Sequence, residues 1–355
     1  MTMFLTIAVI VLIFVVIFQI SKASEYVSVL KGEEISRKQN NKINGFLMVA
    51  FLVLGLIGVW YCNKLYFGKT LLAVDSASVE GARVDSMLWL TIAVTGIVFI
   101  ATQAVLFWFA FKYQETDKRK VFYFAHSNKL EVIWTIIPAI VLTILVIIGL
   151  RNWFLFTGEP PKEAMVVEIT GKQFNWIFRY PGKDGAFGKK YFKNIDEANG
   201  NSLGVIWDDQ LSHDDVVTDK LILIKGRPVK LIIGSRDVIH DVGLSHFRLK
   251  MDAVPGIPTT LWFTPKYTTK EMKELTNNPN FVYEISCDQM CGNSHFSMRG
   301  IIDVIDQEEY DVWQAKQKPQ YLVVFPEKNP SAKPADSTKL ATKPAEAATK
   351  TVAKL

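Results

Sequence analysis

The sequence has few cysteines, three in 355 residues. Cys62 stands alone at the end of an apolar run, and only Cys287 and Cys291 lie close together. So few cysteines exclude a fold held by several disulfides. There is also no C-x-x-C-H motif, which excludes covalent attachment of a c-type haem. Because a histidine and a methionine follow Cys291 so closely, we favour a metal-binding role over a simple disulfide.

The sequence also lacks any long block of one charge. Its formal net charge is only +5, and no run of Lys and Arg suggests a surface for nucleic acid. We therefore predict no nucleic-acid partner. The mean hydropathy of +0.17 is high for a soluble protein, and the length suffices for two domains.

Four apolar runs are long enough to cross a hydrocarbon layer about 30 Å thick, which takes roughly 20 helical residues. They cover residues 3–20, 45–60, 87–111 and 132–150. The first run has no basic residue before it, so we interpret it as a retained anchor and not as a cleaved signal peptide.

The loops between these runs differ in basic residues. Residues 21–44 contain five Lys or Arg and residues 112–131 contain five, whereas residues 61–86 contain three. Basic loops stay in the cytoplasm. We therefore predict that both termini and the whole C-terminal half lie outside the cytoplasm.

After residue 151 the sequence changes to short segments rich in β-branched residues, separated by Gly, Pro and Asn. These segments are residues 165–170, 220–225, 228–234, 260–264, 281–285 and 300–305. Several short strands with frequent turns predict a β-sandwich or barrel. Residues 182–219 are polar and predict a long insertion. Residues 323–355 are rich in Ala, Lys, Pro and Thr and predict a disordered tail.

The stretch CDQMCGNSHFSM, residues 287–298, offers two thiolates, an imidazole and a thioether from Cys287, Cys291, His295 and Met298. This soft donor set suits copper. Two thiolates with two imidazoles would equally suit a structural zinc, but Met298 favours copper. A further histidine must come from elsewhere. His126 lies in a cytoplasmic loop and His213 in the insertion, which leaves His240 and His246, and the residues alone do not choose between them.

The same stretch resembles the binuclear CuA loop of cytochrome c oxidase subunit II. Three more segments are similar to motifs of that family: DVIH at 237–240 followed by MDAVPG at 251–256, EVIWTIIP at 131–138, and GKQFNWIFRY at 171–180. The resemblance covers roughly residues 86–317. It implies transmembrane helices followed by an all-β cupredoxin-like sandwich or barrel, and its spacing selects His240.

The resemblance also implies a role for each site residue. Cys287 and Cys291 would bridge two coppers, His240 and Met298 would complete one, and His295 and the backbone carbonyl of Gln289 the other. Such a centre takes electrons from a cytochrome c and passes them to haem in subunit I, where oxygen is reduced and protons are pumped. Glu131 matches the family's acid at the entrance of a proton path.

The chain departs from the family pattern at several places. Gln289 replaces a glutamate whose carboxylate binds magnesium at the subunit I interface, so a magnesium site there is not carried over. Phe174 stands where the family has its electron-input tryptophan, while Trp176 is retained. Residues 160–320 hold 20 Lys and Arg against 22 Asp and Glu, too balanced to steer a basic cytochrome strongly.

The family core has two transmembrane helices, and this chain has two more. We therefore predict five parts: an additional helical pair at 1–62, an extracytoplasmic loop at 63–86, the core hairpin at 87–153, a periplasmic CuA domain at 154–322, and the tail at 323–355. The additional pair suggests that the donor cytochrome is held in a supercomplex with a quinol-oxidising complex.

The resemblance places the chain in a bacterial inner membrane, with its N-terminus, CuA domain and tail on the periplasmic side. Its partners would be oxidase subunits I and III, a donor cytochrome c and membrane lipid. Three alternatives stay open: a quinol oxidase subunit II, which lacks the copper ligands, the CuA subunit of a nitric oxide reductase, and a membrane-anchored periplasmic copper-binding protein.

Overall fold

The computed structural model describes residues 2–116, 118–120 and 122–328. Most of the predicted tail, residues 329–355, lies outside the described residues. The chain divides into two compact units. Of the described residues, one unit holds those up to Glu159 with Ser245–Leu249 and Leu275–Asn277, and the other holds the remaining residues from 160 to 328.

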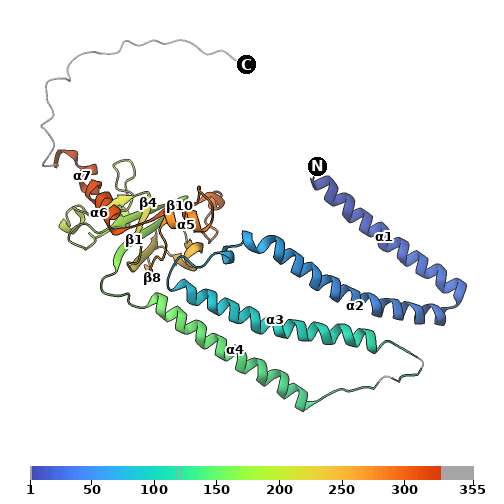
Figure 1. Cartoon of the computed structure of the whole chain (residues 1–355). Helices are drawn as coiled ribbons and strands as arrows, with labels where there is room; N and C mark the ends of the chain where they lie inside the picture. Colours follow the sequence, from blue (N-terminus) through green and yellow to red (C-terminus); the bar gives the residue numbers. More distant parts are fainter. Residues whose placement is uncertain (1, 117, 121, 329–355) are drawn as a thin grey trace, which may run out of the picture. The chain divides into compact units, whose positions relative to one another are not determined.

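The first unit contains four long helices, which Figure 1 shows from blue to green. They are α1 (Thr2–Lys31), α2 (Glu33–Tyr66), α3 (Gly81–Lys112) and α4 (Asn128–Thr157). All four are long and apolar enough to cross a membrane, and nearly all of their apolar side chains are exposed in the isolated chain. This supports the predicted membrane spans, because exposed apolar helix faces require an apolar solvent.

The helices are longer than the apolar runs. The stretch between the first two runs, predicted as a loop, is helical except at Gly32, whose φ of +84° separates α1 from α2. Its polar residues form ion pairs one turn apart, such as Lys38 with Glu34 at 2.8 Å. Such pairs stabilise an exposed helix where apolar packing is absent.

The connection from α2 to α3 contains two 3-10 helices, Phe67–Lys69 and Leu71–Ala73. It is bound within the same unit to the segment Ser245–Leu249. The Ser78 hydroxyl donates to the Phe247 carbonyl at 2.7 Å, and the Arg248 guanidinium donates to the Val74 carbonyl at 2.8 Å. The loop predicted as a separate part therefore has its own buried polar contacts.

The second unit is built on two five-stranded sheets. The first has the order β3-β2-β1-β5-β8, and its strands are Val216–Thr218, Asn175–Tyr180, Met165–Lys172, Val229–Ser235 and Thr259–Phe263. The second has the order β4-β10-β9-β6-β7, and its strands are Lys220–Ile224, Arg299–Ile305, Tyr283–Cys287, His240–Leu244 and Leu249–Ala253.

The two sheets pack face to face around an apolar core. A Cβ built at Gly300 in β10 would lie 3.3 Å from Trp176 and 3.4 Å from Phe178, both of which belong to β2 in the other sheet. Phe178 and Ile285 are fully buried. The predicted fold class, a helical membrane region followed by an all-β sandwich, is confirmed.

Short helices and one long insertion complete this unit. The helices are α5 (Thr269–Leu275), α6 (Gln307–Lys316), α7 (Gln320–Val324) and the 3-10 helices Phe192–Asn194, Gln210–Ser212, Ser245–Phe247, His295–Ser297 and Pro326–Lys328. Of these, the last residue of α5, Leu275, and the 3-10 helix Ser245–Phe247 belong to the first unit.

The predicted insertion at residues 182–219 is tied to β2 by Arg179. This buried guanidinium pairs with Asp215 and donates to the Gly188 carbonyl at 2.7 Å. The insertion also contains β3. Helical structure continues into the range predicted as tail, with α7 and the 3-10 helix Pro326–Lys328. Phe325 lies between these two helices and packs against Trp207, with the ring centroids 5.9 Å apart. Propensity did not predict this packing between distant aromatic residues.

Candidate metal centre

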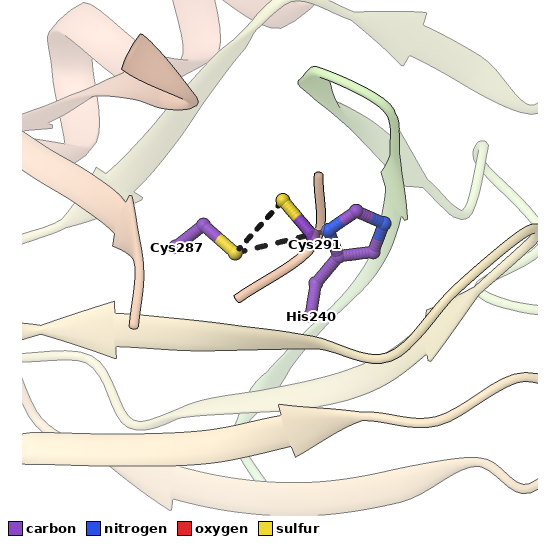
Figure 2. A group of neighbouring side chains, drawn as sticks. All are labelled: His240, Cys287 and Cys291. Carbon is purple, nitrogen blue, oxygen red and sulfur yellow. Dashed lines mark hydrogen bonds between the residues drawn. The ribbon is translucent and has the colours of Figure 1, made fainter. Parts of the chain in front are cut away.

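Three side chains of types that can bind metals meet at one end of the second sheet. The ligand atoms of His240, Cys287 and Cys291 all lie within 4.8 Å of one another. Figure 2 shows the two sulfur atoms and the imidazole facing one another. The Cys287 Sγ is 3.7 Å from the Cys291 Sγ and 3.7 Å from the His240 Nδ1, and both cysteines are free thiols.

The sheet register brings these residues together. β6 and β9 are antiparallel neighbours with Val242 opposite Cys287, so His240 at the start of β6 lies beside the end of β9. The loop after β9 returns to the same place, because the backbone N–H of Cys287 donates to the Met298 carbonyl at 3.2 Å. Gly292, with φ +134°, allows the turn of this loop.

The other predicted donors lie around the same point. The Gln289 carbonyl oxygen is 3.1 Å from the Cys287 Sγ. The His295 Nδ1 is 3.6 Å and the Met298 Sδ 3.8 Å from the Cys291 Sγ. The structure therefore brings together the complete set of six donors; their roles as ligands stay predictions.

His246, the other candidate left open by the sequence, does not join this cluster. It lies in the 3-10 helix Ser245–Phe247, and its carbonyl accepts from the backbone N–H of Ala77 at 2.9 Å. Among the described residues, the cluster therefore includes His240 and not His246.

The ring of His240 is held in one orientation by Asp237. An oxygen of Asp237 lies 2.7 Å from the His240 Nε2, while the other oxygen accepts from the backbone N–H of Gln173 at 2.7 Å. Partial burial acts to raise the pKa of Asp237, but the hydrogen bonds from Gln173, His240 and Val238 outweigh it and hold the pKa below its usual value. The carboxylate is therefore ionised and leaves the Nδ1 lone pair directed at Cys287.

Gln173 also contacts the loop of residues 287–298, and the sequence did not predict this contact. Its side-chain Nε2 donates to the Cys291 carbonyl at 2.5 Å. The turn between β1 and β2 is thus joined both to the histidine and to the cysteine loop. The signal that could have indicated Asp237 was its position three residues before His240; nothing in the sequence indicated Gln173.

The thiols are shielded from water. Burial, and then the neighbouring Cys287, raise the pKa of Cys291 to about 11. Without a metal the thiol keeps its proton, and a metal ion must displace it, since thiolates and not thiols bind metals. Two buried soft donors with two imidazoles and a thioether fit a soft metal such as copper.

Two aromatic residues border the cluster. Trp176 is buried, with its ring 5.9 Å from the His240 ring. Phe174 lies against the loop, since a Cβ at Gly292 would be 3.0 Å from its Cζ. Both contacts are compatible with the predicted electron-input roles, which no observation here tests.

The remaining predicted site residue, Glu131, lies in the first turn of α4, where its side chain is exposed. Acidic residues are stabilised at a helix N-terminus. This position explains the residue structurally, and its role in a proton path stays a prediction.

Two family models match the chain. The transmembrane domain of cytochrome c oxidase subunit II matches residues 69–151, and the periplasmic domain of the same subunit matches residues 165–305. The chain belongs to the cytochrome c oxidase subunit II family. Both α1 and α2 precede the first matched residue, so they are additions to the family's core, as predicted.

Relatives extend over most of this region. The alternative cytochrome c oxidase subunit 2 of Bradyrhizobium diazoefficiens is 32% identical over 237 residues, 66% of this chain and 80% of the relative. The cytochrome c oxidase subunit 2 of Cereibacter sphaeroides is 24% identical over 246 residues, 67% of this chain and 77% of the relative. The solved periplasmic domain of subunit II from Bradyrhizobium japonicum is 23% identical, covering 44% of this chain and 94% of that chain, with a TM-score of 0.30.

Family membership confirms the predicted class of function. The chain is an electron-accepting subunit of a haem-copper oxidase complex and has membrane-spanning helices. It is thus part of an oxidoreductase that contains other oxidase subunits, such as subunit I.

Proposed function

We propose that this subunit accepts electrons from a cytochrome c at a binuclear copper centre and passes them to haem in subunit I. The observation that carries the proposal is the convergence of His240, Cys287 and Cys291 within 4.8 Å, with the Gln289 carbonyl, His295 and Met298 around them. Two free sulfurs 3.7 Å apart, each near a different imidazole, suit a pair of metal ions better than one.

When bound, the copper pair supplies one-electron transfer. The protein's part is to hold the donors still and exclude water. Asp237 holds the His240 ring, Gln173 holds the Cys291 carbonyl, and Trp176 covers the buried side. Donors that do not move on oxidation or reduction lower the cost of reorganisation, which favours fast electron transfer.

The electron enters at Phe174 and Trp176. Phe174 is partly exposed and touches the loop beside Cys291, whereas Trp176 is buried against His240. Phe174 therefore provides the surface end of this route and Trp176 its inner end. The nearly balanced charge of residues 160–320 leaves apolar contact as the main attraction for a donor.

The proposed setting is a bacterial inner membrane with the metal centre on the periplasmic side. Membrane lipid covers the helices, subunits I and III are the neighbours, and Glu131 lies at the cytoplasmic boundary as the entrance of a proton path. The additional helices α1 and α2 hold a quinol-oxidising complex with its cytochrome. Gln289 lacks a carboxylate, so it supplies no magnesium ligand at the subunit I interface.

Spectroscopy of the copper-loaded full-length chain in detergent tests this proposal. A mixed-valence signal from two coppers that share one electron is expected, with two coppers per chain. A single-copper signal, or a preference for zinc, would overturn it.

Turnover of the purified complex then distinguishes an oxidase from the alternative functions. Oxygen consumption with reduced cytochrome c is expected. Consumption of nitric oxide in place of oxygen would indicate a nitric oxide reductase, and a chain that isolates without subunit I would indicate a copper-binding protein.

A further inference from the structure

One carboxylate of the long insertion joins two segments that lie next to the metal centre. The Glu197 Oε1 is 2.7 Å from the Lys172 Nζ and 2.5 Å from the Arg236 Nη1. Lys172 directly precedes Gln173, and Arg236 directly precedes Asp237. Glu197 therefore links the end of β1 to the segment that follows β5.

Both of these segments contact the imidazole of His240 or the group that holds it. A Cβ built at Gly171, the residue before Lys172, would lie 2.8 Å from the His240 Cδ2, so the backbone of β1 is packed against the ring. From the other segment, Asp237 binds the His240 Nε2 and accepts from the backbone N–H of Gln173, each at 2.7 Å. The position of the ring therefore depends on how the two segments are held relative to each other.

The backbone holds the two segments together only in part. β1 and β5 are parallel neighbours, and at their ends the backbone N–H of Arg236 donates to the Gly171 carbonyl at 3.1 Å. Beyond that point the side chains of Asp237 and Glu197 continue the connection. Successive residues of a strand point to opposite faces, so Lys172 points away from the face on which Gly171 meets the imidazole. Asp237 thus closes the inner side, next to the ring, and Glu197 closes the outer side.

Glu197 has a fixed position because it lies in a short hairpin. The backbone groups of Asp196 and Asn201 exchange two hydrogen bonds, of 2.9 and 2.7 Å. The Arg236 Nη1 also donates to the Ser202 carbonyl at 2.8 Å, which binds the base of the hairpin to the same segment after β5. The carboxylate is therefore presented by backbone that is itself hydrogen-bonded.

The hairpin is in turn anchored on the first sheet. Leu203 and Val205 are buried and form an apolar cluster with Ile177 of β2. β2 is the direct neighbour of β1 in the sheet. The place of Glu197 is therefore set by the apolar packing of the insertion on β2, next to the strand that it bridges.

The bridge brings two cations to one carboxylate. The hydrogen bond from Lys172, and after it the contact with Arg236, outweigh partial burial and hold the pKa of Glu197 below its usual value. The carboxylate is therefore ionised at neutral pH. Without it, the two partly buried cations would face each other and repel, which would drive the two segments apart.

We propose that Glu197 is a positioning residue of the metal centre. It holds the segments of Gln173 and Asp237 together from the outer side and so fixes the ring of His240, acting through its two basic partners. The insertion, which contains none of the six donors, thereby adjusts the geometry and the reduction potential of the metal pair. This inference rests on the proposed copper centre.

Glu197→Ala in the copper-loaded full-length chain, in detergent, tests this inference. Both coppers and the mixed-valence EPR signal should be retained, but the hyperfine splitting should change because the His240 ring is held less firmly. Copper affinity, measured by competition with a chelator, should fall by roughly threefold to tenfold, less than is typical when a group bonded directly to a ligand is lost. Redox titration should show a higher reduction potential, since loss of a negative charge favours the state that carries the added electron.

A charge-balanced variant separates position from charge. Glu197→Ala combined with Lys172→Ala removes one charge of each sign, so the net charge is that of the parent chain. The reduction potential should move back toward the parent value, while the hyperfine splitting should stay changed because the bridge is still absent. Recovery of both signals would mean that Glu197 acts only through its charge, and would overturn the inference.

Glu309→Ala is the matched control. Glu309 lies in α6 of the same unit, its side chain is 46% exposed against 48% for Glu197, and it also pairs with a lysine, Lys270, at 2.5 Å. Loss of an exposed pair costs little stability, so this variant should keep the copper affinity, hyperfine splitting and potential of the parent chain. Similar shifts in Glu309→Ala and Glu197→Ala would also overturn the inference.

The parent chain separates this inference from the proposed function. Absence of a mixed-valence signal in the parent chain contradicts the proposed copper pair, whereas a parent signal whose hyperfine splitting Glu197→Ala leaves unchanged contradicts this inference alone. Far-UV circular dichroism shows whether each variant is folded. If Glu197→Ala does not fold, Lys172→Ala breaks the bridge from its other end and should change the hyperfine splitting in the same direction.

Discussion

The two histidines of the metal centre are held in different ways. His240 is completely buried, and its Nε2 is fixed by Asp237 at 2.7 Å. His295 is half-buried in a short 3-10 helix, and its Nδ1 faces Cys291, but no side chain among the described residues forms a hydrogen bond with its Nε2. One imidazole is thus positioned by the fold before any metal binds, and the other is positioned mainly by its own loop.

The difference extends to the residues around each histidine. The buried Trp176 packs against the His240 ring, whereas the loop that contains His295 also carries Phe296, 81% exposed, and Met290, 74% exposed. Exposed apolar residues in a group mark surfaces that contact other proteins. The His240 side is therefore enclosed by this chain's own residues, and the His295 side is the more exposed of the two.

The largest effect is expected at Cys291, which contacts both sides. Cys291→Ser replaces the thiolate that lies 3.7 Å from Cys287 and 3.6 Å from His295, so the chain should lose the mixed-valence signal and bind at most one copper. Copper content and EPR measure this. Cys62→Ser, which changes an exposed cysteine in α2, should leave both unchanged; a binuclear signal that survives in Cys291→Ser would contradict the ligand assignment.

Asp237→Asn should have the next largest effect, because it removes the charge that orients His240. Loss of such a partner typically lowers metal affinity by about 10- to 100-fold. Copper competition with a chelator measures the affinity, and a change in the EPR hyperfine splitting would show that the ring has moved. Asp237→Glu should recover part of the affinity.

Asp219→Asn controls for the loss of one exposed acidic charge in the same unit and should behave as the parent chain. If Asp237→Asn differs from Asp219→Asn only in binding the donor cytochrome, Asp237 is a docking residue and the comparison between the two histidines fails.

Gly292→Ala should disturb the loop by packing. Its added Cβ would lie 2.9 Å from the Gln173 Nε2 and 3.0 Å from the Phe174 Cζ, at a φ of +134° that other residues rarely adopt. We expect a loss of about 1–3 kcal/mol in the free energy of unfolding, measured by denaturant titration, and a shifted copper spectrum.

Gly226→Ala is the matched control for backbone strain. Gly226 has φ +75° and nothing within 4 Å of an added Cβ, so its substitution should lower stability but leave the copper spectrum unchanged. A shift of the spectrum in both variants would show that general destabilisation, and not contact with Phe174, causes the effect.

The smallest effect is expected for Phe174→Ala, which removes an aromatic ring at the surface but no donor. Electron transfer from the reduced cytochrome should slow, while copper content and spectrum stay unchanged; stopped-flow kinetics measure the rate. Phe174→Trp should restore or exceed the parent rate. Equal rates for the parent chain and both Phe174 variants would mean that the electron does not enter through Phe174.

Much of the fold followed from local patterns. Apolar runs predicted the four membrane helices, and β-branched segments predicted the sandwich. The extension of α1 and α2 as far as Gly32 and the contact of Phe325 with Trp207 were not predictable. The first depends on ion pairs along polar helical turns, and the second on aromatic residues over 100 positions apart.

The sequence by itself determined the chemistry of the centre: the soft donors and their spacing lie within twelve residues, from Cys287 to Met298. The tertiary structure decided which side chains support them. Asp237 and the cysteine loop both bind Gln173 in the turn between β1 and β2, and His240 lies beside Cys287 through the register of β6 with β9. Hydrogen bonds between strands set that register, and such pairings between distant segments leave no trace in local composition.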